Sequence, residues 1–337
     1  MYHTGFDVHD ANIQIQHMDE DGCLGIDTKI SKTEFDILDF LDALDGPTTI
    51  TIETSGSYWW LSQMLKNHPK VSQVNIVDAR RSRKVAEELS VQFGYGRASN
   101  DRIDAEMSAH LTRMGLAPTI HIPSAKLLEV RTLNRFRHHL VKNRTRINKH
   151  ANALLKFHGA DRSCNSKILQ NDLEKIPPYV KFIIGEELEY IRAFDNSIEK
   201  TEKFLDKLLP ESHPQISLLL GVPGFGIVLA RYIVTEIKNI KFFKAPKYLI
   251  SYSGLAPVEQ NSDGKKKGKI KLNQFSNRYL KYAFVQAAHN ARNHPKFKRK
   301  YEQDLKLHDK SLAKIILARR IIKNVYWMLT RQQPFRA

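Results

Sequence analysis

The first third of the chain switches repeatedly between two hydrophobic periods. A period of two, typical of half-buried strands, runs through much of the first thirty residues, where Asp21-Gly22 is a hairpin signal. Apolar residues then recur at helical spacing before residues 48–52, which are all β-branched, as expected for a buried central strand. The pattern predicts strands at 3–8, 12–18, 23–30, 48–52 and 71–77, and helices at 35–44, 57–67, 79–90 and 101–115.

Three strands followed by alternating helices and strands make an antiparallel meander with βα units behind it. This order predicts an α/β domain with the ribonuclease-H-like fold. Asp7 lies on the first strand, Glu53 ends the fourth, and Asp101 and Asp104 share one side of the last helix because they are three residues apart. We expect these four carboxylates to converge at one end of the sheet.

Convergent carboxylates can hold two divalent cations that clamp a phosphodiester. Mg²⁺ favours such oxygen-only ligands, and Mn²⁺ is an alternative. Each acid alone also has a simpler interpretation, with Asp7 in a turn, Glu53 at a strand end and Asp101 as a helix cap. The metal interpretation depends on all four acids falling in the right elements and in the right order.

Two later segments, 124–157 and 184–208, carry apolar residues seven positions apart, as helices that pack along a seam do. An antiparallel coiled-coil hairpin is expected. Residues 124–160 hold nine Lys and Arg but one acid, so this hairpin is either an arm that contacts DNA or RNA, with Arg135 and Arg144 as candidates, or a plain dimerisation rod. The seam positions are Leu133, Phe136, Leu140, Ile147, Leu154 and Phe157, then Ile184, Ile191, Phe194, Ile198, Leu205 and Leu208.

Charge is distributed unevenly over the 337 residues. Residues 1–118 hold 11 Lys and Arg against 18 Asp and Glu, whereas residues 119–337 hold 42 against 18. The strongly basic remainder favours a polyanionic partner, with nucleic acid ahead of a membrane surface. Two distant cysteines, Cys23 and Cys164, exclude a disulfide scaffold and a Cys-rich zinc site and suit a reducing cytoplasm.

Residues 216–234 are apolar and about long enough to cross a membrane, but Pro223, Gly224 and Gly226 interrupt them. A turn between two short helices is therefore expected, and no membrane span. Glycines there would let the backbone approach a phosphate, and the following helix offers free N–H groups, as in helix–hairpin–helix motifs. The N-terminus has no basic start before an apolar run, so no signal peptide is expected.

Residues 259–269 form a loop rich in glycine and lysine around Ser262. A serine in such a loop can attack a phosphodiester, because neighbouring cations stabilise a developing alkoxide and bind the phosphate. On chemistry alone, other serines nearby are equal candidates. The lysines are Lys265, Lys266, Lys267 and Lys269, and the other serines are Ser251, Ser253 and Ser276.

Several of these motifs, in this order, resemble the DEDD transposases of bacterial insertion sequences, a family that includes the Piv-type DNA invertases. The resemblance runs through nearly the whole chain. It is carried by Gly5-Phe6-Asp7-Val8, Ile52-Glu53-Thr54-Ser55-Gly56-Ser57-Tyr58, Asn100-Asp101-Arg102-Ile103-Asp104-Ala105, Val222-Pro223-Gly224-Phe225-Gly226 and Tyr252-Ser253-Gly254-Leu255-Ala256-Pro257, together with the loop through Asn277.

The resemblance implies a RuvC-like domain at 1–118, a helical arm at 119–210 and a C-terminal transposase domain at 211–337. It implies that Asp7, Glu53, Asp101 and Asp104 are the family's four acids and that Ser262 is its nucleophilic serine. Relatives act on DNA as oligomers, here expected to be dimers or tetramers, in which the RuvC-like domain of one subunit meets the serine domain of another. They also use a structured noncoding RNA, and the expected location is the bacterial cytoplasm, at the nucleoid.

The chain departs from the family pattern at three places. Ser99-Asn100-Asp101 stands where Lys-Thr-Asp is usual, Asp263 is inserted after Ser262, and the segment up to Asn277 lacks a usual glycine. We expect a metal-assisted DNA transposase or recombinase that transfers strands through Ser262. The alternatives are a RuvC-like nuclease that cuts by water attack, a Piv-like invertase, and a nucleic-acid-binding derivative without catalysis.

Overall fold

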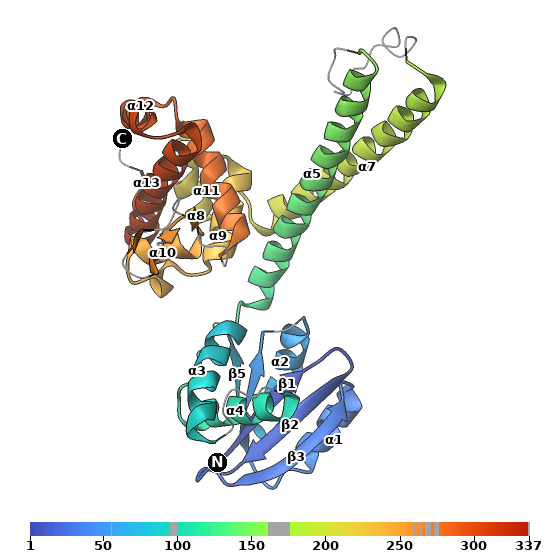
Figure 1. Cartoon of the computed structure of the whole chain (residues 1–337), viewed down its shortest axis with the longest axis vertical. Coiled ribbons are helices and arrows are strands. Elements are labelled where there is room, and N and C mark those ends of the chain that lie inside the picture. Colours follow the sequence, from blue (N-terminus) through green and yellow to red (C-terminus); the bar gives the residue numbers. More distant parts are fainter. Residues whose placement is uncertain are drawn as a thin grey trace. The chain divides into compact units, whose positions relative to one another are not determined.

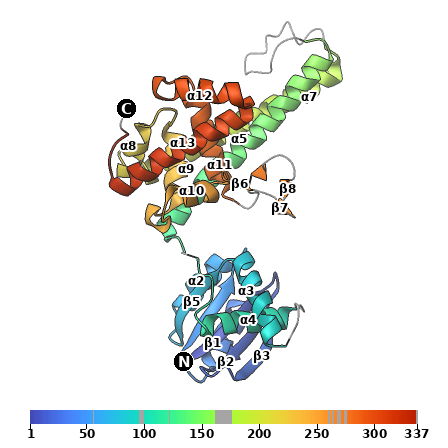
Figure 2. The same ribbon diagram turned by 60° about the vertical axis from the view of Figure 1, so that its left-hand side comes forward.

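The computed structural model describes residues 1–54, 56–94, 100–120, 122–160, 176–258, 261–262, 265–266, 271–272 and 276–335. It divides into two compact units, Met1–Ile122 and Pro123–Ala337 (Figures 1 and 2). Each unit has its own hydrophobic core. The finer division of the sequence into three domains stays a prediction.

The first unit is built on a five-stranded sheet with the order β3-β2-β1-β4-β5. β2 is antiparallel to β1 and β3, whereas β1, β4 and β5 run parallel to one another. This mixed sheet, with helices after its strands, fits the ribonuclease-H-like fold that the sequence predicts. The strands are β1 (Tyr2–Val8), β2 (Asn12–Met18), β3 (Leu24–Ser31), β4 (Thr48–Glu53) and β5 (Val71–Val77).

Side chains alternate between the two faces of the sheet. Phe6, Ile50 and Ile52 point into a core shared with α1 and α2. Residues between them, such as Gly5 and Thr51, face α4, which contacts β1, β2 and β4. The helices are α1 (Glu34–Asp42), α2 (Tyr58–Lys66), α3 (Ala79–Gln92) and α4 (Asp101–Arg113), and α4 is seen in front of the sheet in Figure 1.

The second unit begins with a helical hairpin of α5 (Ala125–Phe157) and α7 (Pro178–Leu208), seen in Figure 1. Ion pairs join Arg137 to Glu202 and His150 to Glu187, so the two helices run antiparallel. Three of the predicted positions in the second heptad segment, Ile184, Ile198 and Leu205, are buried, and the other three are half-buried. That this hairpin is a supercoiled coiled coil stays a prediction.

Two seam positions predicted in the first heptad segment are wrong. Phe136 and Phe157 are 49% and 82% exposed. At the distal end of the hairpin, Ala151 and Leu155 pack against Val180 and Ile184 instead. The helical repeat of 3.6 residues drifts away from a strict repeat of seven, so the buried stripe moves onto neighbouring positions along a straight helix.

The remaining helices of this unit pack with the base of the hairpin, including Val130 and Leu205, around one core in which Tyr232, Phe284 and Leu317 are also buried. The apolar stretch at 216–234 is divided between two of these helices, as predicted. Along the part of the chain that the structure describes, we find no helix with the length and apolar character that crossing a bilayer requires. The helices are α8 (Pro214–Leu220), α9 (Ile227–Ile237), η1 (Ile240–Phe242), α10 (Pro246–Tyr252), α11 (Arg278–Ala291), α12 (Pro295–Leu307) and α13 (Lys310–Arg331).

Candidate functional site

The register of two parallel strands places Asp7 beside Glu53. Phe6 on β1 pairs with Ile52 on β4, so the next residue along each strand is a carboxylate at the same end of the sheet. Asp7 is two residues after Gly5, and Glu53 is two residues after Thr51. Because side chains alternate, both carboxylates face the side of the sheet on which α4 lies.

Gly5 allows α4 to lie unusually close to the sheet. A Cβ atom at this position would be 1.9 Å from the carbonyl oxygen of Ala105 and 2.8 Å from the backbone nitrogen of Ala109. Any larger residue would therefore force the helix away. A hydrogen bond between the buried Thr51 and Thr112 hydroxyls joins the same helix to β4.

The first turn of α4 carries the other two acids. The side chain of Asn100 caps this helix by accepting a hydrogen bond from the backbone N–H of Ile103, at 2.9 Å. Asparagine thus performs the capping that the threonine of the family pattern would provide. Asp101 and Asp104 both lie in that first turn, where the helix dipole favours negative charge.

The four acids act on one another electrostatically. Burial raises the pKa of Asp7, and the charges of Asp104 and Asp101 raise it further, while His9 opposes the shift. Burial also raises the pKa of Glu53, with added repulsion from Asp7 and Asp104, while a hydrogen bond from Ser82 opposes the shift. The four acids are therefore close enough to influence one another electrostatically, and we call Asp7, Glu53, Asp101 and Asp104 the carboxylate cluster.

Two cationic or ligating side chains at this cluster were not anticipated from the sequence. The His9 Nε2 atom lies 3.0 Å from Asp7 Oδ2 and 3.3 Å from Asp101 Oδ2. Lys29 on β3 places its Nζ atom 3.3 Å from Asp101 Oδ2. His9 could have been found from its Asp-x-His spacing, since residues two apart on an extended chain share a side. Lys29 could not, because its approach depends on strand pairing.

The donor set of the carboxylate cluster fits a divalent cation. The site offers carboxylate oxygens from four residues. The pKa values of Asp7 and Glu53 are raised in part by repulsion from neighbouring acids, which a bound cation would relieve. Among the residues that the structure describes, Asp7, His9 and Asp101 bring their ligand atoms within 4.8 Å of one another.

The predicted nucleophile, Ser262, lies in the second unit. It belongs to the two-residue strand β7 (Asn261–Ser262), which pairs antiparallel with β8 (Lys265–Lys266), so that Ser262 is opposite Lys265. A second pair of short strands, β6 (Pro257–Val258) and β9 (Lys271–Leu272), flanks this hairpin in the sequence. Lys267 and Lys269 lie outside the described residues.

One of the competing serines has a structural role. Ser253 is fully buried, and its hydroxyl donates a hydrogen bond of 2.7 Å to the carbonyl of Leu249. A serine that is shielded in this way cannot reach a phosphodiester without local unfolding. Ser253 is therefore a poor candidate for the nucleophile.

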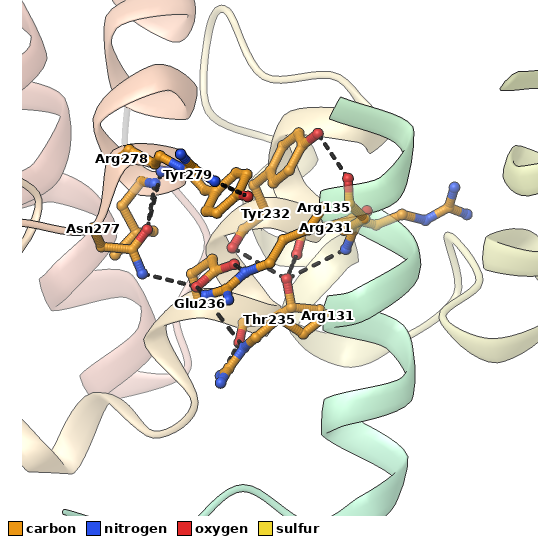
Figure 3. Close-up of polar contacts among 11 residues, drawn as sticks. Arg131, Arg135, Arg231, Tyr232, Thr235, Glu236, Asn277, Arg278 and Tyr279 are labelled. Atoms are coloured by element: carbon orange, nitrogen blue, oxygen red, sulfur yellow. Dashed lines mark hydrogen bonds and ion pairs between the residues drawn. The ribbon is translucent and has the colours of Figure 1, made fainter. Parts of the chain in front are cut away.

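Both ends of the segment that contains Ser262 are fixed to the helical core. Arg319 donates to the carbonyl of Leu255, at 2.6 Å, just before the segment. Just after it, the backbone N–H of Asn277 donates to the carbonyl of Tyr252, at 2.9 Å. The Asn277 side chain caps α11 and also donates to Glu236, at 2.8 Å (Figure 3).

Glu236 is the centre of a buried network that includes one predicted nucleic-acid contact, Arg135 (Figure 3). The Glu236 side chain is 1% exposed and accepts two hydrogen bonds of 2.8 Å from Arg135 of α5. Arg144, the other predicted contact on this helix, forms an ion pair with Asp195 of α7. Both guanidinium groups thus make ion pairs within the chain, and their contact with nucleic acid stays a prediction.

The two glycines predicted to approach a phosphate have different surroundings. Gly224 has a φ of +91°, and a Cβ there would be 2.3 Å from the carbonyl oxygen of Ala287. Its close approach to α11 explains this glycine without a ligand. Gly226 precedes α9 and has no atom within 4 Å of its Cβ position. Nucleic-acid contact at Gly224 and Gly226 stays a prediction.

Comparisons with known proteins match both units. A model of IS110-type DEDD transposases, described as "Transposase", matches residues 4–159, and a model described as "Transposase IS116/IS110/IS902 family" matches residues 216–302. A curated relative from Streptomyces clavuligerus, "Insertion element IS116 uncharacterized 44.8 kDa protein", is 30% identical over 146 residues, or 42% of this chain. The match spans 34% of that relative, about a third of its length.

The mixed sheet and its carboxylate cluster define the first unit as a ribonuclease-H-like domain of the DEDD class. The two family models match in the expected order and together cover well over half of the chain. The chain belongs to the IS110-type family of DEDD transposases.

Proposed function

We propose that this protein is a DNA transposase that cuts and rejoins strands at the carboxylate cluster with Ser262 as its nucleophile. The proposal is supported by the register that ends β1 and β4 in Asp7 and Glu53 at the same end of the sheet, and by the electrostatic influence of the α4 acids on both, in a chain of a transposase family. The cluster lies on rigid elements, as the precise positioning of a phosphodiester requires.

Asp7, Glu53, Asp101 and Asp104 would hold the divalent cations, with Mg²⁺ as the expected ion. When bound, the cations would supply positive charge to the scissile phosphate and to the oxygens that attack and leave. Burial on the α4 side keeps Asp7 and Glu53 from full hydration, which strengthens their attraction for a cation. Asn100 and Gly5 would act indirectly. Asn100 fixes the residue at which α4 begins, and Gly5 lets α4 lie close to β1.

In the proposed reaction the Ser262 hydroxyl oxygen attacks the phosphorus and a strand hydroxyl leaves. The serine loses its proton, the leaving oxygen gains one, and the strand stays joined to the protein as a phosphoserine diester. Attack by a hydroxyl of another strand reverses these bonds and reseals the DNA, so the sequence of steps needs no external energy source. Lys265, Lys266, Lys267 and Lys269 would bind flanking backbone phosphates.

The partners of the proposed reaction are the two DNA segments and a structured noncoding RNA. DNA binding is supported by membership of a transposase family and by the formal net charge of +17. The RNA and a dimeric or tetrameric assembly follow from the resemblance alone. An assembly in which the two units of different subunits act together would bring Ser262 to a carboxylate cluster.

A strand-cleavage assay tests the proposal. The full chain is incubated with Mg²⁺, the flanking RNA and DNA that carries the joined element ends, and cleaved and rejoined strands are measured. We expect products with wild type, none with Asp104→Asn, and unchanged yield with Asp39→Asn, an exposed acid on α1 outside the cluster. Products that persist in Asp104→Asn would contradict the proposed role of the cluster.

A further inference from the structure

We propose that His9 is a nitrogen ligand of a divalent cation at the carboxylate cluster, and that it strengthens the binding of Mn²⁺ at this site more than the binding of Mg²⁺. The inference rests on the proposed function, since it concerns the same metal site. It adds a ligand that the four-acid pattern does not contain and a preference for one class of metal.

The spacing of the ligand atoms supports shared coordination. In octahedral coordination at about 2.1 Å, neighbouring ligand atoms are about 3 Å apart and opposite ones about 4.2 Å apart. His9 Nε2 lies 3.0 Å from Asp7 Oδ2 and 3.3 Å from Asp101 Oδ2, and the three ligand atoms all lie within 4.8 Å of one another. The two distances from His9 are close to those of neighbouring ligands around one ion, and the distance to Asp7 is also that of a hydrogen bond.

Local backbone structure holds His9 in this position. Asp7 and His9 are two residues apart at the end of β1, so both side chains lie on the same side. The His9 N–H donates to the carbonyl of Asn12, at 2.9 Å, and the His9 carbonyl accepts from Lys32 Nζ, at 2.6 Å. These two bonds anchor the backbone of His9 in the turn between β1 and β2.

The side chain of His9 is 41% exposed, which leaves room beside it for water or a phosphate oxygen. A catalytic cation needs such open positions, because substrate must enter its coordination shell. His9 at the exposed edge, together with the half-buried Asp7, would thus bind the cation from one side only.

Imidazole nitrogen changes the metal preference of an oxygen site. Mg²⁺ binds oxygen ligands and gives up water reluctantly, whereas Mn²⁺ accepts nitrogen and oxygen ligands and lies with the transition metals in affinity for imidazole. Loss of the ring should therefore weaken Mn²⁺ binding much more than Mg²⁺ binding. If His9 instead served only as a counter-charge for the two acids, its loss would strengthen binding of both ions.

Electron spin echo measurements on the Mn²⁺-loaded full chain test the inference directly. A coordinated histidine nitrogen produces ¹⁴N modulation of the Mn²⁺ signal, which changes when the protein is labelled with ¹⁵N-histidine. We expect this modulation in wild type and its loss in both His9→Asn and His9→Ala. The matched control is His68→Asn, because His68 also contacts a carboxylate, Asp42, at 3.2 Å but lies away from the cluster.

Calorimetric titration of the same proteins supplies the second measurement. We expect His9→Ala to weaken Mn²⁺ binding by at least about tenfold, with a smaller effect on Mg²⁺, and His68→Asn to change neither. Mn²⁺ that binds without ¹⁴N modulation, or modulation that survives in the His9 variants, would overturn the inference and leave the proposed function standing. A wild-type chain that binds no Mn²⁺ would overturn both.

Discussion

At the residue scale, the close approach of the acids in the carboxylate cluster lowers the stability of the folded chain. Burial and mutual repulsion raise the pKa values of Asp7 and Glu53, which means that their charged forms are less favourable in the folded chain than in water. A fold under selection for stability alone would not bring four acids to one end of a sheet. Such strain is typical of sites that bind a cation.

Replacing Glu53 by glutamine should therefore stabilise the metal-free protein near pH 7. The folded chain holds the Glu53 proton to a higher pH than the unfolded chain, whose pKa is near 4.5, so stability falls as pH rises from that value through the folded pKa. Glu53→Gln removes this loss. We expect a higher melting temperature than wild type at pH 7 in a chelator, and a difference that shrinks toward pH 4.

The same melting experiment with Mg²⁺ supplies the control. Ligand binding to the folded state should raise the melting temperature of wild type and have less effect on Glu53→Gln. Asp39→Asn, which changes an exposed acid, should behave like wild type in both conditions. A Glu53→Gln variant that is less stable than wild type at pH 7 without metal would contradict this account of the cluster.

Two arginines on the same helix should differ sharply in their effect on stability. Arg135→Ala removes both hydrogen bonds to the Glu236 carboxylate, whose side chain is 1% exposed, and should cost about 3 kcal/mol of unfolding free energy. Arg144→Ala removes a partner from Asp195, whose side chain is 51% exposed, and should cost less than about 1 kcal/mol. Denaturant unfolding of both variants measures the difference. A loss for Arg135→Ala as small as that for Arg144→Ala would show that the hydrogen bonds between Arg135 and Glu236 do not stabilise the second unit.

At the scale of elements, the site depends on how α4 lies against β1. Gly5→Ala would place a Cβ atom 1.9 Å from the Ala105 carbonyl oxygen, so α4 must move outward and carry Asp101 and Asp104 with it. We expect a loss of about 1–3 kcal/mol in unfolding free energy and a measurable weakening of metal binding. Gly25→Ala is the matched control, since its nearest contact would be an ordinary 3.5 Å. Unchanged metal binding by Gly5→Ala would show that metal binding does not depend on how closely α4 approaches β1.

Most elements of the first unit follow from the sequence, since strong local patterns decide them. The β-branched run before Glu53 and the alternation at Ile13 and Ile15 each correspond to a strand. The acids could be predicted as a group because parallel strands end at the same edge of a sheet. The contacts of Lys29 with Asp101 and of Arg135 with Glu236 could not, because no motif marks these pairs and their approach depends on how the strands pair and the helices pack.

The hairpin of α5 and α7 shows where a repeat pattern fails. A strict repeat of seven places Phe136 in the seam, yet this side chain is 49% exposed. The positions of a helix that are buried depend on the helices that pack against it. The repeat within one segment does not specify those neighbours. The second segment agreed better, since Ile184, Ile198 and Leu205 are buried and none of its predicted positions is fully exposed.

At the scale of the whole molecule, the charge distribution should dominate nucleic-acid binding. A formal net charge of +17, concentrated after residue 118, implies many phosphate contacts. We expect binding of the full chain to DNA to weaken on the order of a thousandfold between 50 and 200 mM salt. Fluorescence anisotropy across a salt series measures this slope. Affinity that is insensitive to salt would contradict an interface based on phosphates.

The central claim is that the carboxylate cluster and Ser262 act in one reaction, and a covalent adduct tests it most directly. The full chain is incubated with Mg²⁺, the flanking RNA and DNA carrying the joined element ends, then denatured, and the modified residue is mapped by mass spectrometry. We expect DNA joined to Ser262 in wild type, and no adduct in Ser262→Ala or Asp104→Asn. Cut DNA without an adduct, or an adduct at another residue, would contradict it.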